Sequence, residues 1–474
     1  MVKFRFLSCF FLFLSLCVIS CAEANGHPKY LRVGTAVVDS TPTTFPVEIN
    51  GGFFPIFTDR VNDPLHVRAI VIDDGTTCLA MATADVCILS DEIVAEIKSE
   101  IEKRIPLKKE FIMISSTHCH SAPALLKTHA AGIDENYLPL FRQKVVESVV
   151  TAYGNRRDAR VAWGKDFDPE NVFCRRFIMK EGTAWTLDSD FTGSTGDFAQ
   201  MNPGARIQNA ICRTGTPDPS VYVVYFQTPD GKPLALMANY STHYAGSRDI
   251  SADYFGVFCE EIRKRLNADE TFFAVLTNGT SGDTNCIDFY DPARKFDMFS
   301  VGNSVADAAF RAVKNMNFKD WVPVKMTDVK MNIGMRKGTP EQVQKAKKHL
   351  HELEAAGKKL STQNDAYALN TVIMAQMPDQ REITIQAVRI GDVGISILPN
   401  ETYSETGHLI RAASKAPMTF TIGLANGAGG YLPPKKQFEL GGYTTWRTLS
   451  SWMEVDAEEK IRTRLVEMLN QLFE

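Results

Sequence analysis

Apolar runs typical of β-strands alternate with amphipathic helical patterns along almost the whole chain. Strand runs are short and rich in β-branched residues, whereas helical patterns repeat their apolar residues about every 3.6 positions. Strands are expected at 30–39, 66–73, 78–84, 111–115, 160–163, 221–227, 234–239, 271–277, 326–333, 382–390, 393–398 and 419–424. Helices are expected at 91–105, 137–153, 254–266, 301–316, 341–356, 402–413 and 456–472. This alternation predicts an α/β fold with large mixed β-sheets flanked by helices.

The size and composition fit a folded globular chain. Of 474 residues, 44% are hydrophobic and 23% are charged, which excludes a disordered or low-complexity protein. The formal net charge of −4 gives no reason to expect a nucleic-acid partner. We expect residues 27–474 to form a single domain. The long polar connection at 188–218 is rich in Gly and Pro, and its 188–201 part is either a functional lid or a disordered surface excursion.

The first residues indicate export. Lys3 and Arg5 precede an apolar stretch at 6–19, the pattern of a secretory signal peptide at residues 1–20. Two processing sites are possible: a lipoprotein box that would leave a lipidated Cys21 as a membrane anchor, or cleavage after Ala24. Both predict an exported protein, located in the periplasm, at the outer membrane or cell surface as a lipoprotein, or secreted.

The cysteines outside the signal do not suggest a disulfide framework. They are scattered, odd in number and mostly set in apolar runs, so we expect buried thiols. These cysteines are Cys78, Cys87, Cys119, Cys174, Cys212, Cys259 and Cys286.

The strongest local signal for chemistry is a pair of histidines directly after an expected strand. His118 and His120 follow the run 111–115 in the segment Ser116-Thr117-His118-Cys119-His120. In an extended backbone, residues i and i+2 point to the same face, so both imidazoles are expected to converge on one small object. Two neutral imidazoles suit a zinc ion. The alternative is a pair of hydrogen-bonded histidines near a turn.

Further metal-competent residues stand at other strand ends or turns. His243 follows the strand expected at 234–239, and Glu401 follows the one at 393–398. Glu401 has an alternative interpretation, in which it stabilises a helix N-terminus electrostatically. Tyr443 follows a Gly-Gly turn. Ser281 does not lie in a nucleophile elbow, because Asp283 stands where that motif needs a glycine.

Taken in order, these motifs resemble a known family. A T-H-x-H-S-x-P segment, a later strand-end histidine, an L-P-x-E and a late G-G-Y occur in the catalytic N-terminal domain of neutral (non-lysosomal) ceramidases. The resemblance covers about Val33 to Trp452 and implies a ceramidase-like domain of the same fold. We expect no counterpart of the family's immunoglobulin-like C-terminal domain.

The resemblance also implies a cofactor and a site. The family's catalytic domain holds one Zn²⁺ per chain, and its ligands correspond here to His118, His243, Glu401 and Tyr443. His120 corresponds to a histidine that contacts the substrate amide or shares protons, which would make Tyr443 and His120 catalytic groups. An arginine is also expected, at Arg175 or Arg176. The alternative for both arginines is ordinary surface charge. Asp85 and Asp283 match acidic family positions and are expected in supporting roles.

The implied activity is hydrolysis of the linear amide bond of N-acylsphingosine-type lipids by a metal-activated water. The substrate is thus a lipid or other small molecule, and the role lies in sphingolipid metabolism. Asn285 and Thr444 depart from the family pattern, so other interpretations stay open. One is a zinc hydrolase of another exported substrate, such as an acylated glycan or another amide or ester. Another is a non-catalytic, surface-anchored binding lipoprotein. A third is a barrel amidohydrolase, which also opens with an H-x-H after an early strand.

Overall fold

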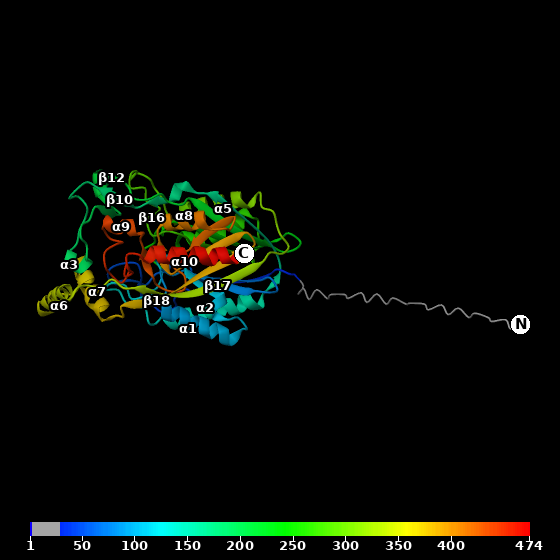
Figure 1. Ribbon diagram of the computed structural model, residues 1–474, viewed down its shortest axis with the longest axis horizontal. Coiled ribbons are helices and arrows are strands. Elements are labelled where there is room, and N and C mark those ends of the chain that lie inside the picture. The colour runs from blue at the N-terminus through cyan, green and yellow to red at the C-terminus, as the bar shows by residue number, and fades with distance from the viewer. Residues whose placement is uncertain (2–28) are drawn as a thin grey trace.

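The computed structural model describes residue 1 and residues 29–474 (Figure 1). The expected signal peptide, with its two processing sites at Cys21 and Ala24, lies outside the described residues. Among the described helices, none combines the length and hydropathy needed to cross a membrane.

Three larger sheets carry most of the strands, and each has the same connectivity. In each, three strands that neighbour one another in the sheet run antiparallel in chain order, and a helix then leads to a fourth strand parallel to the third; the first sheet has β7 as an additional edge strand. The first sheet, in the order β6-β5-β4-β1-β7, contains β1 (Arg32–Asp39), β4 (His66–Asp73), β5 (Cys78–Ala84), β6 (Ile112–Ser116) and β7 (Arg157–Asp158). The second, in the order β15-β14-β13-β8, contains β8 (Arg160–Phe167), β13 (Ser220–Gln227), β14 (Pro233–Tyr240) and β15 (Phe273–Asn278). The third, in the order β17-β18-β19-β21, contains β17 (Val324–Gly334), β18 (Gln380–Ile390), β19 (Val393–Ile397) and β21 (Met418–Ile422).

Each sheet is associated with two helices. One of them connects the parallel strand pair, which requires a crossover connection. The crossover helices are α1 (Asp91–Arg104), α4 (Asp253–Arg265) and α8 (Ser404–Ala413). A second helix follows the parallel strand and packs on the same sheet: α2 (Leu138–Gly154), α5 (Met298–Val313) and α10 (Ala457–Leu472). In Figure 1, α1 and α2 lie at the bottom, α5 at the top and α10 across the front.

The strands are continuously apolar because both of their faces are buried. In β13, Tyr222, Val224 and Phe226 face a core shared by all three sheets. The alternate residues Val221, Val223 and Tyr225 pack instead against the core beneath α4 and α5. The three sheets therefore surround one central core, and their helices cover the outside.

The predicted α/β class with mixed sheets and flanking helices is confirmed. The barrel alternative is wrong, because the described strands form separate open sheets rather than one closed ring.

Smaller elements complete the described part of the chain. The short strands are β2 (Val47–Ile49), β3 (Ile56–Thr58), β9 (Phe173–Cys174), β10 (Arg176–Met179), β11 (Ala199–Met201), β12 (Ala210–Arg213), β16 (Thr284–Asn285), β20 (Asn400–Thr402) and β22 (Gly430–Leu432). The remaining helices are α3 (Ser189–Thr192), α6 (Pro340–Ala355), α7 (Gln363–Gln376) and α9 (Lys435–Glu439), with 3₁₀ turns at η1 (Lys109–Phe111), η2 (Pro169–Asn171) and η3 (Gly204–Asn209). Helices α3, α6 and α7 gather at the left end of Figure 1.

The connection at 188–218 contains α3, β11, η3 and β12, so the alternative of a disordered excursion is wrong. A lid role for its 188–201 part stays a prediction. Its strands are too short and polar to stand out as a periodic pattern. They form because both pair with β10.

Candidate metal centre

The candidate ligands lie where the three sheets present the carboxyl ends of their strands. His118 follows β6, His243 follows β14 and Glu401 lies in β20 just after β19. One metal-competent atom from each of these three residues lies within 4.8 Å of the other two. All three side chains are buried, with 3%, 2% and 7% of their residue surface exposed. Residues far apart in sequence are thus brought to one point.

The two histidines of the H-x-H segment converge, but not through an extended backbone. Strand β6 ends at Ser116, and His118 adopts φ = +71°, in the left-handed region. The Nε2 atoms of His118 and His120 are 3.3 Å apart. The expectation of a shared strand face was wrong in its geometry, because a tight left-handed turn produces the convergence.

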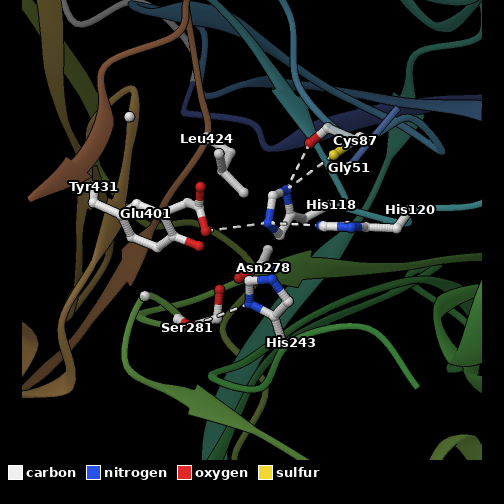
Figure 2. A network of polar contacts seen from close by, with 12 residues as sticks. Gly51, Cys87, His118, His120, His243, Asn278, Ser281, Glu401, Leu424 and Tyr431 are labelled. Carbon is white, nitrogen blue, oxygen red and sulfur yellow. Dashed lines mark hydrogen bonds and ion pairs between the residues drawn. The ribbon is translucent and has the colours of Figure 1, made fainter. Parts of the chain in front are cut away.

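Hydrogen bonds fix the tautomers of the two candidate histidine ligands (Figure 2). His118 Nδ1 lies 2.8 Å from the Cys87 carbonyl oxygen, and His243 Nδ1 lies 3.2 Å from that of Ser281. A carbonyl oxygen only accepts, so each ring carries a proton on Nδ1, and in its neutral form the lone pair is on Nε2. Such second partners orient metal-binding histidines in known sites. In their neutral forms both rings therefore present Nε2 to a cation.

Glu401 supplies the third lone pair. Its Oε2 atom is buried without a hydrogen-bond partner among the described residues and lies 3.3 Å from His118 Nε2. An orphaned carboxylate oxygen facing an imidazole lone pair is costly unless a cation or proton lies between them. This donor set fits zinc, which binds nitrogen and carboxylate oxygen ligands.

The charges around the cluster act differently on the three imidazoles. Burial opposes protonation of His118, yet Cys87 and Glu401 outweigh it and raise the His118 pKa. Burial lowers the pKa of His120 and His243, and the Arg175 guanidinium lowers both further. The latter two rings are therefore neutral.

Two tyrosines stand beside the carboxylate. Strand β20 pairs with β22 in parallel, and this register sets Tyr431 directly opposite Glu401. Arg175 Nη2 donates a hydrogen bond to the Tyr431 hydroxyl at 3.4 Å. Tyr443 lies behind Tyr431, with ring centroids 5.6 Å apart, and burial raises the Tyr443 pKa to about 12. Both phenols line the cavity together with Glu401, so Tyr431 joins Tyr443 as a candidate, and the expectation that Tyr443 binds the metal stays a prediction.

The two candidate arginines have different positions. Both are buried, so the alternative of ordinary surface charge is wrong. Arg175 donates to the Gly282 carbonyl and to Tyr431, beside the cluster. Arg176 donates instead to Gln437 and to the Gly441 carbonyl, underneath the turn that carries Tyr443. Arg175 therefore contacts a residue of the cavity wall, Tyr431, whereas the hydrogen bonds of Arg176 go to the segment before Tyr443.

The expected supporting acids lie outside the cluster. Asp85 forms a buried ion pair with Arg68 at 2.6 Å, at the end of β5. Asp283 accepts hydrogen bonds from the backbone and hydroxyl of Ser404. Both hold strand-end loops together and touch none of the three ligands.

His120 is held by two neighbours. Tyr244 stacks on its ring, with centroids 3.9 Å apart. Gly51, at φ = +108°, lies so close that a Cβ atom there would stand 2.0 Å from His120 Nδ1. The ring therefore has one available position.

A cavity of about 380 Å³ opens next to the cluster and is lined by His118, His120, Glu401, Tyr431 and Tyr443. Its other walls are largely apolar and include Phe53, Leu126, Ile373, Met377 and Leu449. In the aromatic run at 53–57, Phe53 lines the cavity, whereas Ile56 and Phe57 are exposed at 53% and 60%. The cavity thus combines an apolar wall with a polar end.

Comparison with known proteins supports the fold. No protein-family model and no curated protein sequence match the chain. The crystal structure of neutral ceramidase from Pseudomonas aeruginosa matches with a TM-score of 0.69 and 15% identity, over 94% of this chain and 74% of that one. A structure described as ceramidase complexed with C2 matches with a TM-score of 0.66 and 14% identity, over 94% and 75%. The chain therefore has the neutral ceramidase fold, and the resemblance drawn from the motifs is confirmed at that level.

The sequence analysis missed three residues of the site. Tyr431 follows a second Gly-Gly pair, at 429–430, which resembles the one before Tyr443. Tyr244 is adjacent to His243 in sequence and was available as a candidate. Cys87 gives no signal of its own, because only the fold brings it next to His118.

Proposed function

We propose that the protein is a zinc-dependent amidase of the ceramidase type. The observation that carries the proposal is the convergence of His118 Nε2, His243 Nε2 and the orphaned Glu401 Oε2 beside a largely apolar cavity. In this proposal these three residues hold one zinc ion, with the hydroxyls of Tyr443 and Tyr431 as the adjacent phenols. When bound, zinc acts as a Lewis acid and lowers the pKa of water to about 7.

The remaining polar groups would position the substrate and move protons. His120 is neutral, lines the cavity and is fixed by Tyr244, so it can accept a proton from the attacking water and return one to the leaving amine. Arg175 carries a buried positive charge directed at the cluster by Tyr431. It would stabilise the charge that develops on the amide oxygen.

The cavity favours an amphiphilic N-acyl substrate. Apolar side chains such as Phe53, Ile373 and Met377 would contact an acyl chain, while the imidazoles and phenols meet the amide. We therefore propose N-acylsphingosine-type lipids as the substrate class.

We further propose that the protein is exported through its N-terminal signal, as a lipoprotein anchored at Cys21 or as a secreted protein cleaved after Ala24. Metabolic labelling with a fatty acid distinguishes these routes, because only the lipoprotein incorporates label, and a Cys21→Ser variant would not.

The test combines metal analysis with product analysis. Purified protein is incubated with N-acylsphingosine and with acylated sugars, with and without chelator, beside His118→Ala and a His349→Ala control on the distant helix α6. We expect one zinc per chain and release of fatty acid from the lipid, both lost in His118→Ala only. Turnover of acylated sugars alone would show that the substrate is an acylated glycan and not an N-acylsphingosine-type lipid. Bound zinc without turnover of any substrate would favour a binding protein, and full activity of a zinc-free variant would end the proposal.

A further inference from the structure

The repeated connectivity assigns Cys87 a position equivalent to that of a candidate metal ligand. In the first sheet, Ala84 pairs with Ser116, and the next amide, of Thr117, donates to the Ala84 carbonyl at 2.9 Å. The second sheet repeats this arrangement, with the Gly279 amide donating to the Tyr240 carbonyl at 2.9 Å.

The position of Cys87 relative to His243 follows from the two equivalent residues, Ala84 and Tyr240. His243 stands three residues after Tyr240, and Cys87 stands three residues after Ala84. The first sheet therefore presents a sulfur ligand where the second sheet presents the imidazole of His243.

Cys87 lies within reach of two histidines of the centre. A metal-competent atom from each of Cys87, His118 and His120 lies within 4.8 Å of the others, and all three residues line the cavity. Cys87 Sγ is 3.6 Å from His118 Nδ1. Two ligands of a tetrahedral ion with metal–sulfur and metal–nitrogen bonds of about 2.3 and 2.1 Å stand about 3.6 Å apart. The two atoms are already spaced to share one ion.

We propose that Cys87, His118 and His120 form a second metal site, specific for a thiophilic divalent cation, whose occupation excludes zinc from the His118–His243–Glu401 site. The second site differs chemically because it contains a sulfur ligand. Thiolates favour soft cations, whereas a carboxylate favours harder ones. Cd²⁺ is the probe that discriminates best between the two sites.

Exclusion follows from the tautomers of His118. A neutral imidazole has one proton and one free lone pair. An ion at Nδ1 breaks the 2.8 Å hydrogen bond to the Cys87 carbonyl and moves the ring proton to Nε2. There it is donated to Glu401 Oε2, 3.3 Å away, so Nε2 no longer binds zinc. The thiol proton of Cys87 passes to solvent as the metal–sulfur bond forms.

The test is titration of the metal-free protein with Cd²⁺, following the ultraviolet charge-transfer absorption of a cadmium–thiolate bond. A Cys212→Ser background removes the exposed thiol. We expect one thiolate-bound cadmium per chain. The absorption should be lost in Cys87→Ser and in Cys87→Ala. In His120→Ala, cadmium should bind more weakly by about tenfold or more. Cys259→Ser, a buried thiol on α4, is the matched control and should keep the absorption.

Zinc release tests the exclusion. Cd²⁺ added to zinc-loaded protein should release zinc one for one, and Cys87→Ser should need about tenfold or more Cd²⁺ for the same release. Absorption that persists in both Cys87 variants would overturn the second site, and zinc that stays bound beside thiolate-bound cadmium would overturn the exclusion. The exclusion rests on the proposed function, whereas the absorption does not. Glu401→Gln should therefore lose zinc but keep the cadmium–thiolate absorption.

Discussion

Gly51 determines where the His120 ring can lie, which makes it a sensitive test of the role of His120. In Gly51→Ala, the new Cβ would stand 2.0 Å from His120 Nδ1, whereas ordinary contact begins at 3.4 Å. The ring or the loop must therefore move by about 1.4 Å, the difference between these distances. The backbone is also strained, because φ = +108° is a conformation that residues with a side chain rarely adopt.

We expect a large loss of activity with zinc still bound. A displacement of about 1 Å of a catalytic group costs roughly 100-fold in rate. Since the three atoms nearest to the new Cβ all belong to His120, which is not a proposed zinc ligand, the zinc content should stay at one per chain. The assay compares kcat for amide hydrolysis with zinc content in the same preparations.

Gly52→Ala is the matched control. A Cβ there would meet its nearest neighbour at 3.3 Å, the carbonyl oxygen of Phe54 in its own loop, so activity should stay within about threefold of wild type. Wild-type activity in folded Gly51→Ala would refute the assignment of His120. Loss of zinc in Gly51→Ala would show that the loop supports the metal ligands instead.

Three further predictions concern stability and the turn beneath Tyr443. Burial lowers the pKa of His129 from 6.5 to about 4, so between these pH values only the unfolded chain takes up a proton at this residue. The free energy of unfolding should therefore drop by about 3 kcal/mol between pH 6.5 and 4. Urea unfolding of His129→Gln should show a pH dependence that is smaller by this amount. Asp85→Asn leaves the Arg68 charge buried without its partner and should lower the free energy of unfolding by about 3–5 kcal/mol. A smaller loss in the double variant Arg68→Met, Asp85→Asn would confirm that the unpaired charge is the cause. Arg176→Met should lower the free energy of unfolding by about 2 kcal/mol and leave the zinc content unchanged, because Arg176 hydrogen-bonds the segment before Tyr443 and none of the proposed zinc ligands. Loss of zinc from Arg176→Met would contradict this placement.

The sequence identified the site residues that follow long apolar strands. His118, His243 and Glu401 are polar residues directly after buried runs, and such positions point out of a sheet at its carboxyl edge. Their convergence depends on three sheets meeting around one core, which no local pattern reveals. The motif order supplied that information through the family resemblance.

The position of Tyr431 in the site depended on strand register. Both Tyr431 and Tyr443 follow a Gly-Gly pair, so their local sequences are alike. Only the pairing of β20 with β22 places Tyr431 opposite Glu401. The left-handed turn at His118 was also not predictable, because non-glycine residues adopt this conformation only where tertiary contacts hold them there.

The threefold repetition was not visible in the sequence for a related reason. The three sheets share strand order and direction, while their residues need only be apolar and of suitable size. The equivalence of Cys87 and His243 therefore appears in the hydrogen bonds after β5 and β14 rather than in any repeated motif.

The most direct measurement is a crystal structure of the zinc-loaded protein with data collected on both sides of the zinc absorption edge. We expect a single anomalous peak bonded to His118 Nε2, His243 Nε2 and a Glu401 carboxylate oxygen, with nitrogen distances near 2.0–2.1 Å. A peak elsewhere, or zinc-loaded crystals in which these three side chains bind each other directly with no anomalous density between them, would contradict the account.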